Sequence, residues 1–186
     1  YEARPLFTTE EIYRTDLSEV VLRMSELGIR EFETFDFLSP PKRQDIIGAV
    51  ETLRMLDALN EDNSLTSIGK MKAEFPLLPR HSRIIVEAVH AYPAVLEESV
   101  IAASFLSSST PFLLPSGEEI EARRAHHQFR DKFGDFVSYI KLLRAFIRTS
   151  NKSEFCTRSY LDLKVMNDLV RIKEQLEEIG ANLGIP

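Results

Sequence analysis

Few residues in this chain could act as nucleophiles or bind a metal: one cysteine, Cys156, and the adjacent histidines His126 and His127. Adjacent side chains on a helix point about 100° apart, so the two histidines cannot converge on one metal ion by themselves. A lone cysteine is more often a small buried hydrophobic residue than a nucleophile. The phosphate-loop pattern G-x-x-x-x-G-K-[ST] does not occur. We therefore expect no catalytic residue, no metal site and no cofactor in this chain.

Positive charge is concentrated in one stretch of an otherwise acidic chain. The 186 residues carry a formal charge of -6. Between Arg123 and Arg158, nine lysines and arginines stand against three acidic residues, which leaves a surplus of six positive charges. Such a segment can present a basic face to phosphates. The residues alone favour the simpler alternative, in which the solvated side of an amphipathic helix carries Lys141, Arg144, Arg148 and Lys152.

Two further groups of polar residues could bind an anion. The segment 107–110 reads Ser-Ser-Ser-Thr, and its small hydroxyl groups and backbone N–H groups can bond phosphate oxygens without reading bases. Arg80 follows Pro79 at the start of an expected helix, where a cation opposes the helix dipole. Such a local conflict sometimes marks a binding site. A plain polar loop and an ordinary surface arginine are the competing interpretations.

The elements that must position these residues are expected to be helices. Only 7 glycines are present, which argues against strands joined by tight turns. Asp16 is expected to cap the first helix and Gly28 to end it. Later helices are expected over about 67–75, 118–133 and 135–147, and a long last helix is expected to end at Gly180.

A small β-hairpin is the exception that the sequence predicts. A second helix, with Ile46, Ile47, Val50 and Leu53 on its buried side, is expected after Pro40 and Pro41. Residues 56–66 then place two short apolar segments around a polar turn. Two helices and a hairpin are the parts of a winged helix. The loop 32–38 is too apolar to lie free in solvent, so we expect it to pack on another part of the protein.

Composition also bears on location. The uncharged stretch 99–116 contains several serines and prolines, so no membrane-spanning segment is expected. A single cysteine fits a reducing compartment, and we expect the protein to be cytoplasmic. The N-terminal residues Tyr1–Pro5 are neither a signal peptide nor preceded by a start methionine, so the chain is expected to begin inside a longer protein.

Three motifs follow one another along the chain. The first reads F-D-F-L-S-P-P over 35–41 and continues with L-R-M-L-D-A-L over 53–59. The second reads L-T-S-I-G-K over 65–70 and continues with E-F-P-L-L-P-R over 74–80. The third joins A-S-F-L-S over 103–107 to D-K-F-G-D-F over 131–136. In this order they resemble the C-terminal part of DEAH/RHA-type ATP-dependent RNA helicases, and the last motif is similar to the bacterial branch.

The resemblance implies a mainly α fold with three parts. Residues 1–14 would be a segment leaving the second motor domain, 15–78 a winged-helix domain with a small β-hairpin, and 79–186 a helical-bundle ratchet domain. In this family the ratchet closes a channel and grips single-stranded RNA. RecA-like motor domains, which bind ATP and Mg, advance the strand in the 3′ to 5′ direction. An OB-fold domain usually follows. The parent protein would be an ATP hydrolase, whereas this chain alone would not.

The resemblance also places an RNA-facing loop at 107–112. DNA is kept as an alternative ligand, since the sequence does not reveal a preference for RNA over DNA. Phe136 stands where many members have histidine, which puts any histidine contact there in doubt. A protein-interaction module that never touches nucleic acid is the alternative function. The candidate nucleic-acid-binding residues are Arg80, Ser107, Ser108, Ser109, Thr110, Arg123, His127 and Lys132.

Overall fold

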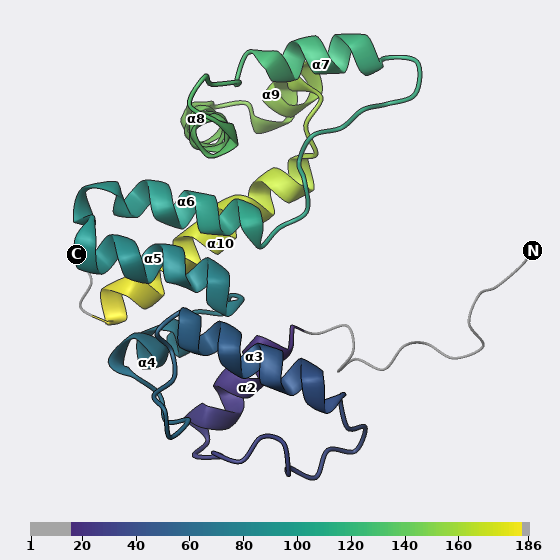
Figure 1. Ribbon diagram of the computed structural model, residues 1–186. Helices are drawn as coiled ribbons and strands as arrows, with labels where there is room; N and C mark the ends of the chain where they lie inside the picture. Colours follow the sequence, from purple (N-terminus) through teal and green to yellow (C-terminus); the bar gives the residue numbers. More distant parts are fainter. Residues whose placement is uncertain (1–15, 184–186) are drawn as a thin grey trace, which may run out of the picture. The chain divides into compact units, whose positions relative to one another are not determined.

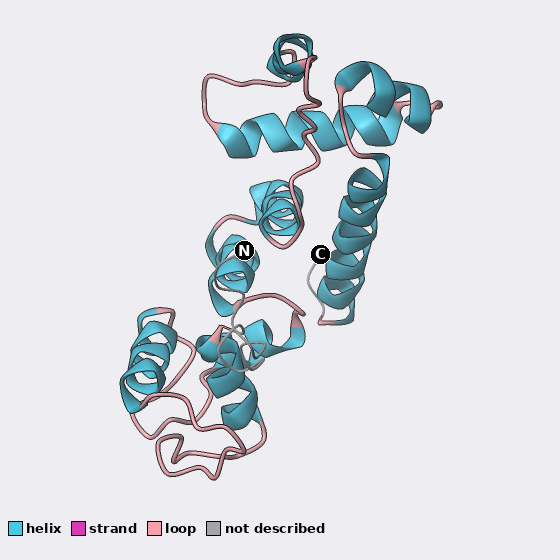
Figure 2. Cartoon of the chain, turned by 90° about the vertical axis from the view of Figure 1, so that its right-hand side faces the viewer, coloured by secondary structure: helices cyan, strands magenta, loops and turns pink. Residues whose placement is uncertain are grey.

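The computed structural model describes residues 16–183, and these form two compact units that divide within one helix, after Val86. The segment 1–14 expected to leave a motor domain lies outside the described residues, as does most of the closing L-G-I-P. Within the described part every regular element is a helix and no strand is formed (Figure 2). The mainly α fold class is thus confirmed, and the boundary expected between 78 and 79 stays a prediction.

The first unit begins with three helices whose ends follow the sequence closely. They are α2 (Leu17–Glu26), α3 (Arg43–Met55) and α4 (Ser67–Glu74) (Figure 1). Asp16 caps α2 by accepting a 2.9 Å hydrogen bond from the Ser18 N–H, and Gly28 follows α2 with φ of 88°. Thr66 caps α4 in the same way, because its hydroxyl accepts from the Gly69 N–H at 2.9 Å. These caps satisfy N–H groups that the first turn leaves without partners.

The core of the first unit lies between α2 and α3. Val21 and Leu22 of α2 meet Ile46 and Leu53 of α3, and Phe32 packs against the same cluster. The expectation for α3 is corrected in part, because Ala49 is fully buried whereas Ile47 and Val50 are half-buried. The prediction that the apolar loop 32–38 is packed holds for only some of its residues. Phe32 and Phe37 pack on the core, but Phe35 is 42% and Leu38 107% exposed.

The expected β-hairpin does not form. Leu59 and Leu65 make a single antiparallel bridge around a turn in which Asn60 N–H donates to the Ser64 carbonyl at 2.8 Å. The chain leaves α3 through Asp57 at φ of 55° and enters α4 at the Thr66 cap. The eight residues between these fixed points hold the turn and one bridge, and no second bridge extends the pair into strands. The winged-helix interpretation, which needs such a hairpin, is therefore not supported.

Lys72 is the unusual member of the first unit, because its side chain is fully buried. Its ammonium group donates a 2.5 Å hydrogen bond to the carbonyl of Leu56, at the end of α3. Burial, with a smaller effect from the Arg83 charge, lowers the pKa of Lys72 to about 8. Asp57 acts in the opposite direction. A buried amine is costly when charged, so the stability of this unit depends on pH.

The second unit is a bundle built around α6. The helix α5 (Pro79–Ala91) crosses the division between the units, and a short 3-10 turn, η1 (Pro93–Val95), leads into α6 (Leu96–Leu106). Residues 100–105 of α6 are all buried, as expected of a helix with neighbours on several sides. It packs against α8 (Asp135–Arg148) and α10 (Leu163–Asn182), whereas α7 (Glu119–His127) packs against α9 (Lys152–Ser159) (Figure 1).

Three helix boundaries in this unit differ from the sequence prediction. The helix expected over 118–133 ends at His127, and the chain turns until Gly134, at φ of 116°, starts α8. The helix α9 was not predicted, although Asn151 caps it by accepting from the Glu154 N–H at 3.1 Å. The last helix continues past Gly180 to Asn182. Among the described helices, none is long and apolar enough to cross a membrane.

Candidate nucleic-acid interface

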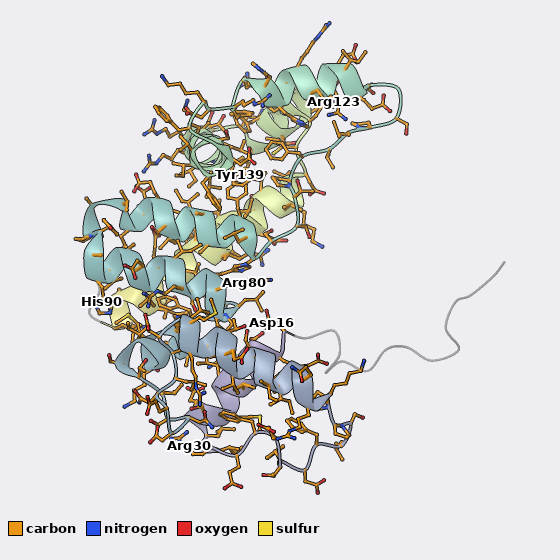
Figure 3. The ribbon with its side chains drawn as sticks, in the orientation of Figure 1. Asp16, Arg30, Arg80, His90, Arg123 and Tyr139 are labelled. Carbon is orange, nitrogen blue, oxygen red and sulfur yellow. The ribbon has the colours of Figure 1, made fainter. Side chains whose placement is uncertain are left out.

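The second unit contains an open pocket with a volume of about 490 Å³ between α7, the start of α8 and the loop before α7. Cationic and aromatic side chains share its wall. Arg123 lies on α7 and Tyr139 on α8, as Figure 3 shows. The lining residues are Phe112, Leu114, Arg123, His126, His127, Phe129, Arg130, Asp135, Ser138 and Tyr139.

The turn between α7 and α8 is held by its own hydrogen bonds. The Asp131 N–H donates to the Ser138 hydroxyl at 2.8 Å, and the Asp131 carboxylate accepts from the Phe133 N–H at 2.9 Å. The same carboxylate pairs with Lys141, whose hydrogen bond is the main reason that the pKa of Asp131 is lowered. This network fixes the corner at which α7 ends, so the pocket wall is formed by ordered backbone.

The other side of the pocket is anchored to the connection between α9 and α10. Phe112 and Leu161 form an antiparallel bridge, in which the Leu113 N–H donates to the Tyr160 carbonyl at 2.9 Å and the Asp162 N–H to the Pro111 carbonyl at 2.8 Å. His126 Nε2 also donates to the Tyr160 carbonyl, at 2.9 Å. Because Tyr160 accepts from both segments, it joins the loop before α7 to the last turn of α7.

The basic stretch divides into cations used inside the fold and cations left exposed. Lys141 pairs with Asp131, and Arg144 donates to both Glu97 and Glu98 at 2.7 Å. Lys152 donates to three carbonyls at the end of α8, including that of Ile147 at 2.7 Å. Such contacts stabilise a helix C-terminus. Among the described residues, no side-chain hydrogen bond or ion pair is made by Arg123, Arg124, Arg130 and Arg148.

Of the four residues in the solvated-face alternative, Lys141, Arg144 and Lys152 are engaged by other groups of the fold, and Arg148 is exposed without a side-chain partner in the described part of the chain. The two exposed arginines Arg123 and Arg130 line the pocket, together with His127. They have no carboxylate partner of their own within the described part of the chain. Asp135 is the one acidic residue of the wall, so the pocket is positive on the α7 side and carries a carboxylate at the start of α8.

The predicted site residues fall into four places. Arg123 and His127 line the pocket. The segment 107–110 leads directly to Phe112, and Ser107 uses its hydroxyl to donate to the Ala103 carbonyl at 2.8 Å. Lys132 lies outside the pocket lining, with its amine 4.9 Å from the centre of the Phe133 ring. Arg80 is exposed on α5 (Figure 3), and it belongs to the first unit, whereas the other predicted residues belong to the second.

Sequence reasoning missed several pocket residues as a set, although one signal for them exists. Arg123, His127 and Arg130 are spaced i, i+4 and i+7, which is the spacing of one helix face. The aromatic members had no such signal. Phe112 and Tyr139 come from a loop and from another helix, and they reach the same wall only through the tertiary fold.

Comparison with known proteins places this geometry in a family context. Residues 78–139 match the family described as Helicase associated domain (HA2), ratchet-like. This range contains α5, α6, α7 and the start of α8, and thus all the candidate binding residues and all the residues of the pocket wall. The match begins at α5 and does not extend into α2, α3 or α4.

The whole chain also aligns with longer proteins. It is 46% identical over 186 residues to "ATP-dependent RNA helicase HrpA" of Borreliella burgdorferi, which covers 100% of this chain and 23% of that protein. It is 28% identical over 187 residues to "Probable ATP-dependent RNA helicase DHX35" of Homo sapiens, covering 100% of this chain and 26% of that protein. The HrpA of Escherichia coli is 29% identical, with 99% and 15% covered. The chain thus spans about a quarter or less of these relatives.

Proposed function

This chain belongs to the helicase-associated region of DEAH-box ATP-dependent RNA helicases, and from that premise we propose that its second unit grips single-stranded RNA at the pocket between α7 and α8. The role is accessory. The strand is moved by RecA-like motor domains elsewhere in the parent protein, which bind ATP and Mg and hydrolyse the nucleotide. The ratchet-like unit, together with the motor domains and an OB-fold domain, closes the channel around the strand in the cytoplasm.

The observation that carries this proposal is the mixture of side chains in one wall. Single-stranded nucleic acid presents phosphates on one side and flat bases on the other, and its binding sites combine cations with aromatic rings. The exposed guanidinium groups of Arg123 and Arg130 suit the phosphates. The rings of Phe112 and Tyr139 stand in the same pocket. Contacts to phosphate carry no sequence information, so the grip should be indifferent to base order.

Replacing Arg123 and Arg130 together by alanine is expected to weaken RNA binding by about tenfold or more. The reason is that a hydrogen bond to a charged group contributes about 1.5–3 kcal/mol. The matched control is Arg124→Ala, because Arg124 is the next residue on α7 and equally exposed, but lies outside the pocket. Affinity for homopolymeric RNA is measured by fluorescence anisotropy over a salt series, for this chain and for the parent helicase. Equal binding by the double variant and the Arg124 variant would refute the proposed site.

Lys132 and the segment 107–110 extend the same surface in this proposal. Removing Lys132 is expected to reduce the slope of log affinity against log salt by about 0.7, the value for one phosphate contact on a single strand. All RNA sequences should be affected alike. The triple change of Ser107, Ser108 and Ser109 to alanine is expected to weaken binding without altering the slope, since hydroxyl groups displace no counterions. An unchanged slope after Lys132→Ala places its amine away from phosphate.

A protein-interaction module without nucleic-acid contact is the competing proposal. Exposed apolar residues of the first unit favour it, because Leu38 is 107% and Met55 85% exposed. The two proposals differ in a simple result. If the arginine variants bind and unwind RNA as well as the unaltered helicase, the accessory role is played through protein contacts. If unwinding falls together with RNA affinity, the strand-gripping role is supported.

A further inference from the structure

Two phenylalanines are exposed on either side of the start of α8. The side chain of Phe133 is 76% exposed and that of Phe136 is 48% exposed, although an aromatic ring is favoured inside a core. They flank Gly134 and Asp135, the residues at which the helix begins. Neither ring contributes to the buried cluster of the second unit. A pair of exposed rings beside a polar pocket suggests a contact with a ligand rather than a role in folding.

The Phe136 ring is held in place by a row of rings that starts in the core. Phe105, which is buried, stacks on Tyr139 with centroids 4.5 Å apart and planes inclined by 8°. Tyr139 in turn meets Phe136 edge to face, with centroids 6.3 Å apart and planes inclined by 78°. Edge-to-face and stacked pairs are favourable arrangements of rings. Phe136 is therefore an exposed ring with a fixed support, which costs little entropy to use in binding.

The charges of the pocket decide which part of a strand could lie there. Arg123 and Arg130 lie on the α7 side, whereas Asp135 lies next to Phe136 on the α8 side. A phosphate close to Asp135 would be repelled by its carboxylate. A base has no charge to repel, and its exocyclic amines can donate to a carboxylate. A strand bound in this pocket would therefore lie with its phosphates toward α7 and its bases toward α8.

We propose that Phe136 is a stacking platform for one base of the single-stranded nucleic acid whose phosphates pair with Arg123 and Arg130. The inference rests on the proposed function, because it adds a second contact next to the same pocket: Phe136 does not line the pocket, but its ring meets that of the lining residue Tyr139. Phe136 is preferred over Phe133 for two reasons. The amine of Lys132 lies over the Phe133 ring at 4.9 Å, which occupies one of its faces. Phe133 also makes no ring contact with a pocket residue in the described part of the chain.

The test separates stacking from phosphate contacts by using RNA with and without bases. An oligouridine and an abasic oligomer of equal length carry the same phosphates. This chain is expected to bind the oligouridine about five- to tenfold more tightly, since stacking on an aromatic side chain contributes about 1–3 kcal/mol per base. Phe136→Ala should abolish that preference and leave the salt slope unchanged. Arg123→Ala should lower the salt slope and leave the preference intact.

The matched control is Phe133→Ala, which removes a more exposed ring three residues earlier, at the same turn. It should retain the preference for bases. An equal loss in both variants, or a Phe136→Ala chain that still prefers bases, would overturn the assignment to Phe136. If neither phenylalanine variant changes the preference for bases, while Arg123→Ala still lowers the salt slope, then the phosphate contacts stand and only the stacking on Phe136 is refuted.

A second measurement tests the same contact without Phe136→Ala, which could lose the preference for bases simply because it does not fold. The chain contains no tryptophan, so Phe136→Trp introduces a single fluorescent indole that can itself stack on a base. Its emission is expected to be quenched by oligouridine and not by the abasic oligomer at saturating concentrations. Equal emission with both ligands would contradict the proposed contact without any dependence on the alanine variant.

Discussion

Replacing Gly69 by alanine is expected to destabilise the first unit by about 3 kcal/mol or more. Gly69 lies in the first turn of α4, and a Cβ atom placed there would stand 2.0 Å from the carbonyl oxygen of Ala58. That oxygen also accepts the Thr66 N–H at 3.0 Å, so it belongs to the backbone that begins α4. The clash is with backbone, which no rotamer change relieves. The whole α3–α4 connection must move to admit one methyl group.

Gly48→Ala is the matched control for this prediction. Gly48 lies inside α3, is exposed, and a Cβ atom there would meet nothing within 4 Å. Alanine should therefore stabilise the helix by about 1 kcal/mol, through its lower backbone entropy in the unfolded chain. Denaturant unfolding followed by circular dichroism compares the two variants. Similar stabilities for Gly48→Ala and Gly69→Ala would show that the close approach at Ala58 is not maintained in solution.

The sequence predicted best where the cause of the structure is local. Asp16 and Thr66 cap helices because their side chains reach N–H groups two or three residues along the chain. Gly28 ends α2 because it adopts a positive φ that other residues avoid. These effects depend on a few consecutive residues, so they can be read directly from the sequence.

The hairpin shows where local reasoning fails. Two short apolar segments around a polar turn, as over 56–66, are typical of a small hairpin, but a strand also needs length and a paired neighbour. Asp57 turns the chain at one end and the Thr66 cap fixes the other. The segment satisfies its backbone groups through a turn and one bridge instead. The sequence pattern over 56–66 does not show how many residues can pair, because that number depends on how the tertiary structure fixes the two ends of the segment.

The candidate site was predictable in its charge and not in its shape. The surplus of positive charge between Arg123 and Arg158 is visible in the sequence, and so is the spacing that puts Arg123 and His127 on one face. Which cations remain available is a tertiary property. Arg144 is engaged by Glu97 and Glu98, more than forty residues earlier in the chain. Tyr139 joins the pocket wall only because α8 packs against α6.

The buried Lys72 leads to the second large prediction, a free energy of unfolding that rises with pH. The pKa of Lys72 falls from 10.5 to about 8 in the folded chain, mainly through burial and also through the charge of Arg83. Between these two pH values the unfolded chain holds the proton and the folded chain does not. Stability increases with pH wherever the unfolded state binds more protons. The loss of stability that comes from burying the amine of Lys72 is therefore complete below pH 8 and absent above pH 10.5.

The expected size of this effect is at most about 3 kcal/mol, since one pKa unit corresponds to about 1.4 kcal/mol. Other groups also titrate in this range. Burial raises the pKa of the Cys156 thiol, and a thiol that ionises first in the unfolded chain lowers stability as the pH increases. The quantity to measure is therefore the difference between the unaltered chain and Lys72→Met at each pH, because the contribution of Cys156 cancels in that difference.

Denaturant unfolding from pH 7 to pH 10.5 tests this prediction, with Lys70→Met as the control. Lys70 lies two residues before Lys72 on α4 but is exposed, so its removal should change stability by the same amount at every pH. For Lys72, the free energy of unfolding of the unaltered chain should instead increase relative to that of Lys72→Met as the pH rises. A difference that stays constant would mean that Lys72 keeps its proton in the fold. Its amine would then be solvated or paired with Asp57 strongly enough to offset burial.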